Sequence, residues 1–158
     1  MIFLVVEKRY QHLTLEKLLR SAITATLKHQ RVSRGSEVTL VISGDAKLKK
    51  LNREFRRQNK ITDVLSFPSG EYKREGGRRY LGDVVISLPR ARVQAKERGY
   101  SLEEELQLLT VHGVLHLLGH DHLLSREKTH MWAAQEDILK KLGHAANNLR
   151  NEQLSREH

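Results

Sequence analysis

The sequence predicts a single domain that combines β-strands with helices, and three observations lead to this prediction. A chain of 158 residues is long enough to bury one hydrophobic core without further staples. Short runs of apolar and β-branched residues, typical of strands, lie at residues 2–6, 37–43, 62–68 and 81–88. One helical segment is apolar almost all round, which predicts a buried central helix. We expect the domain to cover residues 1–143 and the polar tail at 144–158 to be frayed.

The N-terminal part of the chain predicts a strand, a helix and a second strand. Residues 2–6 are apolar and β-branched, as in a buried strand. Thr14 has the side chain of a helix N-cap, and apolar residues follow it at helical spacing to about His29. Residues 37–43 alternate and are rich in β-branched side chains, which predicts the second strand.

A strongly basic helix is expected from Ala46 to about Arg57. Its buried side should carry Leu48, Leu51 and Phe55. Between residues 45 and 60 there are seven basic and two acidic residues. This concentration favours a site for a polyanion over a merely solvated surface. The candidate contacts are Lys49, Arg53, Arg56, Arg57 and Lys60.

Two further strands and a basic connection follow this helix. The runs at 62–68 and 81–88 predict strands. The polar segment between them predicts a long hairpin loop with the basic residues Lys73, Arg74, Arg78 and Arg79. Pro89 suits the first turn of another helix, which should end near Gly99.

The clearest helix start in the chain is the capping box from Ser101 to Glu104. From Leu106 onward this helix is apolar on nearly every side, so we expect it to be the buried central helix. A last helix is expected from Ser125 to Gly143.

The composition limits the classes of function. The chain contains no cysteine, which excludes disulfides and thiolate metal sites. The apolar N-terminal run is too short for a signal peptide and no run reaches membrane-spanning length, so we expect a cytoplasmic protein. The formal net charge of +9 fits either a well-solvated basic surface or a polyanionic partner.

Four of the nine histidines lie within residues 111–122, which read V-H-G-V-L-H-L-L-G-H-D-H. His112 and His116 are four residues apart and therefore lie on one face of a helix. Gly119 can end that helix in a left-handed cap and return His122 toward the other two histidines. Three converging imidazoles hold a metal ion and leave one coordination position open for water.

Two neighbours of these histidines leave alternatives open. His120 is the second candidate for the third ligand, although metal geometry favours His122, which lies beyond the turn at Gly119. Asp121 either orients a ligand imidazole as a hydrogen-bond acceptor or satisfies the turn. An all-histidine site also does not distinguish zinc from other divalent ions.

The spacing of the three histidines and Gly119 matches the zinc motif of the metzincin peptidases, H-E-x-x-H-x-x-G-x-x-H. The chain departs from that motif at Gly113, where a metzincin has the glutamate that activates its water. Glu105 cannot substitute, because seven residues of helix separate it from His112 by about 10 Å along the axis. We therefore expect the zinc scaffold without the peptidase chemistry.

Further motifs accompany the histidine segment, which reads H-G-x-L-H-L-x-G-H-D-H at residues 112–122. They are T-D-V-L-S-F at 62–67, L-G-D-V-V-I-S at 81–87, Leu51-Asn52 and the aromatic–arginine pair Phe55-Arg56. Together they resemble the YbeY family of bacterial ribosomal RNA maturation factors, over about residues 36–143. The resemblance implies an α+β fold, with a small mixed sheet covered by helices.

The resemblance also implies a zinc-dependent, single-strand-specific endoribonuclease that acts in 16S rRNA 3′-end maturation and ribosome quality control. His112, His116 and His122 would hold one zinc ion per chain, and Arg56 would be the functional arginine. Family members often read Y-R-G-K-D-K-P-T where this chain reads F-R-R-Q-N-K-I-T, so Arg57 stays an alternative to Arg56. The implied partners are single-stranded RNA, the 16S rRNA precursor and the small ribosomal subunit, with no role on DNA or membranes.

In this hypothesis Arg56 neutralises charge on the phosphate, while Lys49, Arg53, Arg57 and Lys60 bind the flanking backbone. Two other functions stay open: a non-catalytic ribosome-assembly factor with bound zinc, and a metzincin-like zinc peptidase. Three histidine ligands leave an open position, which argues against a purely structural metal. No residue in the sequence is identified as the general acid or base.

Overall fold

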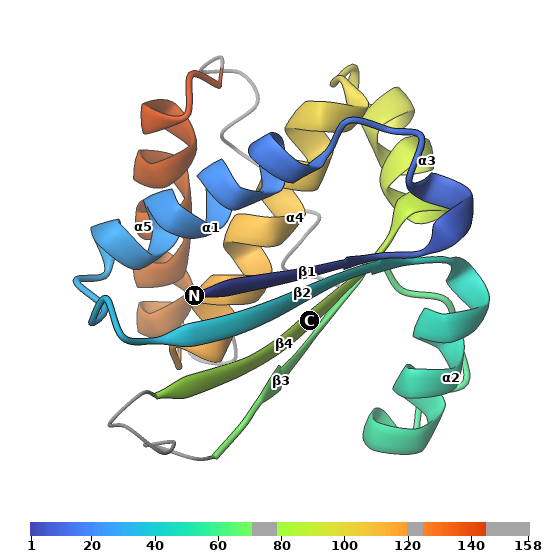
Figure 1. Ribbon diagram of the computed structural model, residues 1–158, viewed down its shortest axis with the longest axis horizontal. Coiled ribbons are helices and arrows are strands. Elements are labelled where there is room, and N and C mark those ends of the chain that lie inside the picture. Colours follow the sequence, from blue (N-terminus) through green and yellow to red (C-terminus); the bar gives the residue numbers. More distant parts are fainter. Residues whose placement is uncertain (71–78, 120–124, 145–158) are drawn as a thin grey trace.

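The computed structural model describes residues 1–70, 79–119 and 125–144. Its strands are β1 (Ile2–Val6), β2 (Glu37–Ser43), β3 (Val64–Pro68) and β4 (Tyr80–Ser87). Its helices are α1 (Glu16–His29), α2 (Asp45–Arg56), α3 (Leu88–Arg98), α4 (Leu102–Leu117) and α5 (Ser125–Lys141), with a short 3-10 helix η1 (Lys8–Tyr10) after β1 (Figure 1). The order of strands and helices expected from the sequence is confirmed.

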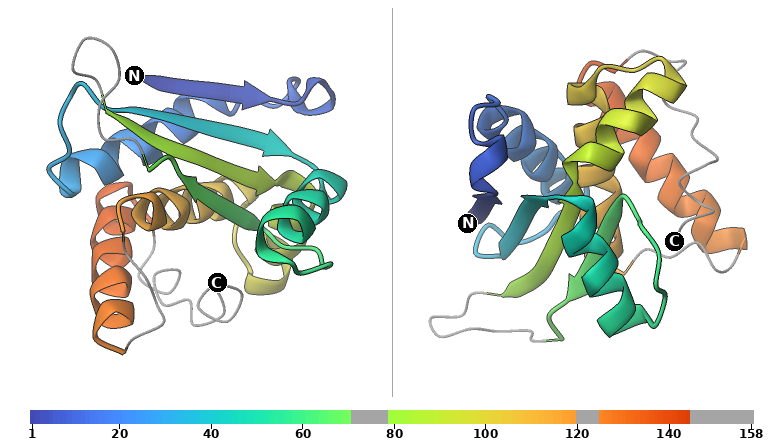
Figure 2. Two further views of the ribbon diagram at one scale, coloured as in Figure 1. Left: turned by 90° about the horizontal axis from the view of Figure 1, so that it is seen from below. Right: turned by 90° about the vertical axis from the view of Figure 1, so that its right-hand side faces the viewer.

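The four strands form one sheet in the order β1-β2-β4-β3. β1 pairs with β2 and β2 with β4 in parallel, whereas β3 pairs with β4 in antiparallel. The sheet is therefore mixed, as the family resemblance implies. β1 and β3 are its two edge strands and lie on opposite sides of the fan of strands (Figure 2).

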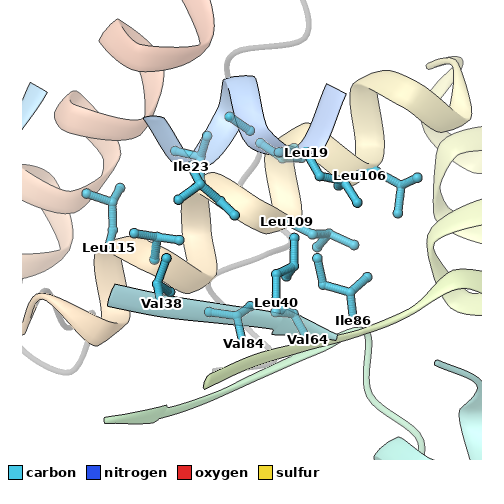
Figure 3. Packing of buried hydrophobic residues seen from close by; sticks show 14 of the residues in the cluster. Leu19, Ile23, Val38, Leu40, Val64, Val84, Ile86, Leu106, Leu109 and Leu115 are labelled. Atoms are coloured by element: carbon cyan, nitrogen blue, oxygen red, sulfur yellow. The ribbon is translucent and has the colours of Figure 1, made fainter. Parts of the chain in front are cut away.

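The main hydrophobic core lies between one face of the sheet and the helices α1 and α4 (Figure 3). Alternate strand residues point into it, because successive side chains of a strand face opposite sides. The labelled core residues are Leu19, Ile23, Val38, Leu40, Val64, Val84, Ile86, Leu106, Leu109 and Leu115. α4 contacts α1, α3, α5, β3 and β4, so it is the central helix that its all-round apolar sequence predicts.

A smaller core lies on the other face of the sheet, where α2 covers the β3–β4 side (Figure 1). Leu48 of α2 packs there with Leu65 of β3 and Val85 of β4. Leu51 and Phe67 are partly buried against the same cluster. Because α2 covers only this part of the sheet, the outer face of β1 stays open, with Phe3 and Val5 exposed.

Three local expectations are wrong. β1 is a half-exposed edge strand rather than a buried one, since strand order is decided by long-range pairing that an apolar run does not reveal. α1 begins one residue later than expected, with Leu15 at the N-cap position in place of Thr14. Phe55 is 65 % exposed, because α2 extends beyond the part of the sheet that buries Leu48.

Both ends of α4 follow the sequence prediction. At its start, the Ser101 hydroxyl accepts from the Glu104 amide at 3.1 Å and the Glu104 carboxylate accepts from the Ser101 amide at 3.1 Å. At its end, Gly119 has a positive φ of 96°, as the predicted left-handed cap requires. Among the helices within the described residues, none is both long and apolar enough to cross a membrane.

Candidate functional site

The C-terminal half of α4 presents His112 and His116 side by side. The two residues are one helical turn apart, and their ring centroids lie 4.7 Å from each other. His112 is buried, with 1 % of its surface exposed, while His116 is half-buried. The helix therefore brings two imidazoles together at the boundary between the core and the surface.

A small cavity of about 20 Å³ lies next to these two rings. Its lining residues come from two consecutive elements, α2 and β3, and from the distant helix α4: Arg56, Val64, Ser66, His112 and His116. Arg56 ends α2, Val64 and Ser66 belong to β3, and the histidines belong to α4. The fold thus joins the predicted functional arginine to two of the predicted metal ligands.

Gln135 of α5 holds one ring nitrogen of His112. Its side-chain carbonyl Oε1 lies 3.1 Å from His112 Nδ1. A carbonyl oxygen only accepts, so Nδ1 carries the proton and donates, and in a neutral ring Nε2 is then the nitrogen whose lone pair can bind a metal. A ligand imidazole held through its second nitrogen is the usual arrangement in metal sites. The two imidazoles therefore fit a divalent metal such as zinc.

A chain of polar contacts fixes α2, β3 and α4 around the cavity. The Arg56 guanidinium donates to the Ser66 carbonyl oxygen at 3.4 Å. The Ser66 hydroxyl in turn donates to the Gly113 carbonyl oxygen at 2.8 Å, inside the core. Because β3 is an edge strand, its outer side is accessible to the arginine from α2.

α4 packs closely against the sheet at Gly113. A Cβ atom added there would lie 2.5 Å from Val84 Cγ1 and 3.3 Å from Ser66 Oγ and Val64 Cγ2. A larger side chain fits only if Val84 shifts, so packing disfavours a glutamate at this position. The departure from the metzincin motif has a structural reason as well as a chemical one.

Glu105, the other acidic residue considered for this site, lies elsewhere. Its carboxylate is fully buried and accepts from Arg98 at 2.7 Å in an ion pair between α3 and α4. It therefore serves the packing of two helices, as its distance along α4 indicates.

The remaining predicted residues divide into two groups. His122, Asp121 and the alternative ligand His120 lie outside the described residues, as do Lys73, Arg74 and Arg78. Within the ranges that are described, no three acidic, cysteine or histidine side chains come together as a metal site. The predicted RNA contacts Lys49, Arg53, Arg57 and Lys60 are all exposed.

The two candidate arginines take different positions at the end of α2. Arg56 is the last helical residue and lines the cavity. Arg57 is the C-cap, with a left-handed backbone at φ 55°, and is not among the residues that line the cavity. Of the two arginines, Arg56 is therefore the one that lines the cavity together with the histidines.

Two site residues were not anticipated from the sequence. Ser66 lies within the T-D-V-L-S-F stretch, so a motif marked its segment but not its contact with Gly113. Gln135 has no marking motif: it is one polar residue of an amphipathic helix, and only the packing of α5 on α4 brings it to His112.

Comparisons with known proteins agree on one family. Residues 5–143 match the family described as Endoribonuclease YbeY. A protein named Endoribonuclease YbeY from Carboxydothermus hydrogenoformans is 44% identical over 130 residues, covering 82% of this chain and 87% of the relative. One from Solibacter usitatus is 50% identical over 97 residues, covering 61% of each chain.

The chain spans less than two thirds of the length of some relatives that it matches. The match with Endoribonuclease YbeY from Myxococcus xanthus is 47% identical over 116 residues and covers 73% of this chain but 40% of that protein. Among solved structures, the solution structure of TM1509 from Thermotoga maritima is similar, with a TM-score of 0.62 at 26% identity. That similarity covers 90% of this chain and 89% of the other, so the two share the overall fold.

Proposed function

Since the chain belongs to the endoribonuclease YbeY family, we propose that it is a zinc-dependent endoribonuclease specific for single strands. Its substrate in this proposal is the 16S rRNA precursor on the small ribosomal subunit, which it cuts during 3′-end maturation and ribosome quality control. The reaction is the hydrolysis or transesterification of a phosphodiester bond.

The observation that carries the proposal is the shared cavity of Arg56, His112 and His116. A cation that binds phosphate and two metal-ligand imidazoles are the parts that phosphodiester cleavage needs, and they come from distant positions in the sequence. The hydrophobic core does not need a cation at that point, and the hydrogen bond from Arg56 to the sheet is long, at 3.4 Å. The arrangement is therefore better explained by a reaction than by folding.

His112 and His116 would hold the zinc ion, with His122 as the third ligand. Three protein ligands leave a coordination position open, and bound zinc supplies a Lewis acid that lowers the pKa of water toward about 7. Gln135 holds the His112 ring in the tautomer that ligation needs.

Arg56 would bind the phosphate at which cleavage occurs. The Ser66 carbonyl holds one nitrogen of its guanidinium at the edge of β3. A planar guanidinium donates two parallel hydrogen bonds to phosphate oxygens, and its charge offsets the negative charge that grows there. Lys49 and Arg53 precede Arg56 at i, i+4 and i+7 spacing, so α2 supplies a stripe of three cations that leads to the cavity.

Metal analysis combined with an RNA cleavage assay tests this function. Wild-type protein should hold about one zinc per chain and cleave a single-stranded RNA, and a chelator should abolish cleavage. His116→Ala should lose zinc and cleavage together, whereas Arg56→Ala should lose cleavage and keep the metal. Arg57→Ala removes the same charge one residue away from the cavity, so it should lower cleavage less than Arg56→Ala does. Full cleavage by zinc-free His116→Ala protein would refute the proposal.

The substrate is tested in cells that carry only one form of the protein. If the protein cuts the precursor, cells with Arg56→Ala should accumulate 16S rRNA with an unprocessed 3′ end. A non-catalytic assembly factor would instead tolerate Arg56→Ala as long as the protein folds and holds zinc. Normal 16S 3′ ends in these cells would exclude cleavage as the function.

A further inference from the structure

Phe55 is an exposed aromatic residue that the fold does not explain. It lies on the apolar side of α2 with Leu48 and Leu51, yet 65 % of its surface is exposed while Leu48 is fully buried. A large apolar side chain left in water contributes little to stability. The position next to Arg56 suggests a different reason for it.

Within the described residues, the ring of Phe55 contacts the ring of Phe67 in β3. The ring centroids are 5.4 Å apart and the planes meet at 67°, an edge-to-face arrangement. Phe67 is partly buried against the small core formed by Leu48, Leu65 and Val85, which holds this ring in place. Phe55 therefore has a fixed neighbour and still exposes most of its ring.

This aromatic pair and the cavity lie on the two sides of one edge strand. Phe67 faces the small core under α2, whereas its neighbour Ser66 turns its hydroxyl to Gly113 on the α4 side. Arg56, next to Phe55, reaches the Ser66 carbonyl at the outer edge of β3. A polymer that passes over this edge would meet the aromatic pair immediately before or after the arginine.

We propose that Phe55, supported by Phe67, is a stacking platform for an unpaired base of the RNA, next to the nucleotide whose phosphate binds Arg56. This inference deepens the proposed function and rests on it. Exposed aromatic rings beside a cationic stripe are how proteins bind single-stranded nucleic acid, since every base offers a face for stacking. Lys49 and Arg53 supply the cations on the same helix.

The platform would also give a reason for single-strand specificity. In a duplex both faces of an internal base are already stacked and its edge is paired, so no face is available to Phe55. An unpaired strand can turn a base out onto the ring at no cost in base pairing. Stacking would then discriminate between the two forms of RNA by binding alone.

A binding experiment tests the platform without relying on catalysis. The full-length protein is kept in chelator, which prevents cleavage, and its affinity for a fluorescent ten-nucleotide adenosine RNA is measured by anisotropy. The same measurement uses a ten-unit abasic ribose-phosphate oligomer. Phe55→Ala is compared with Phe55→Trp and with Phe3→Ala, an exposed phenylalanine on the opposite edge strand β1. Thermal melting checks that each variant is folded.

Phe55→Ala should weaken binding of the adenosine RNA on the order of tenfold, as expected for one lost base stack, and leave the abasic oligomer unchanged. Phe55→Trp should retain the affinity, and Phe3→Ala should bind like the wild type. An equal loss on both oligomers, or no loss on either, would overturn the proposal. The zinc and cleavage assays are separate measurements, so absence of nuclease activity would refute the proposed function while leaving a base-dependent loss at Phe55 intact.

Discussion

At the scale of single residues, Gly113 decides how closely α4 approaches the sheet. Gly113→Ala would place a methyl carbon 2.5 Å from Val84 Cγ1. Alanine is the better helix former by about 1 kcal/mol, so in an open position this substitution would stabilise the protein. Here the clash should reverse the sign and lower the free energy of unfolding by about 1–3 kcal/mol, measured by urea denaturation.

The matched control for this prediction changes the residue on the other side of the contact. Val84→Ala removes the Cγ1 atom that the new methyl group would meet. The double variant should therefore be less destabilised than the sum of the two single variants, since each substitution relieves part of the other's cost. A higher free energy of unfolding for Gly113→Ala would contradict the close contact between α4 and β4 at this position.

Gln135 carries the second prediction at this scale. Gln135→Leu removes the acceptor for His112 Nδ1 and leaves the ring free to take the other tautomer or rotate. Loss of such a supporting contact typically weakens metal binding, so zinc affinity should fall about 10- to 100-fold, measured by competition with a chromogenic chelator.

Gln135→Glu separates positioning of the ligand from packing, because it keeps an acceptor oxygen at the same reach. This variant should retain most of the zinc affinity. Gln107→Leu is the second control: Gln107 is another buried glutamine, whose amide donates to the Leu18 carbonyl and whose Oε1 contacts His144, a histidine that does not line the cavity. Equal zinc affinities for Gln135→Leu and wild type would show that Gln135 does not position the ligand.

At the scale of elements, a buried polar cluster holds α3, α4 and the start of β3 together. Arg98 and Glu105 form an ion pair at 2.7 Å, with side chains 8% and 0% exposed. With its amide nitrogen turned toward the carboxylates, Gln94 donates to Glu105 Oε1 and Asp63 Oδ2 at 3.1 Å each. Asp63 also accepts from the Val64 amide, at the first residue of β3. The cluster therefore fixes the strand that carries Ser66 against the helix that carries the histidines.

Arg98→Met should be strongly destabilising for this reason. It removes the cation and leaves the Glu105 carboxylate buried, which typically costs about 3–5 kcal/mol of unfolding free energy. The exposed pair Lys141–Asp137 is the matched control, and Lys141→Met should change stability by less than about 1 kcal/mol. Urea denaturation of both variants measures the difference. Similar values for the two would mean that the buried cluster does not hold the helices.

The sequence predicted elements well where the signal is local. The strands at β2 and β4 and the capping box of α4 follow from alternation and from side chains that bond their own backbone, which neighbouring residues determine. The exposure of β1 and Phe55 could not be predicted this way. Each depends on where the sheet ends and on how far α2 extends past it, which is decided by pairing between distant segments.

At the scale of the whole molecule, the candidate site combines local and long-range information. The proximity of the His112 and His116 rings could be predicted, because one helix carries both at i, i+4 spacing. The position of Arg56 beside the two histidines could be expected only from the family resemblance, and nothing in the sequence indicated the contact of Gln135 with His112. Both contacts arise because the packing of the whole domain brings α2 and α5 next to α4. The third expected ligand, His122, lies outside the described residues and stays a prediction.

With a net charge of +9, the protein could attract RNA through its overall charge or bind it through the cations of α2, and the two can be tested separately. If α2 binds the RNA backbone, the double variant Lys49→Gln/Arg53→Gln loses two contacts with phosphate groups. For single-stranded nucleic acid each contact contributes about 0.7 to the slope of log affinity against log salt, so the slope should become shallower by about 1.4.

The control removes the same charge from the other side of the molecule. Lys17 and Lys28 are exposed on α1, which covers the opposite face of the sheet from α2 (Figure 1). Lys17→Gln/Lys28→Gln should leave the slope unchanged, because the phosphate contacts are intact, even though the net charge falls by the same two units. Equal slopes for the two double variants would mean that RNA is attracted by the overall charge, and α2 would then not be the binding surface.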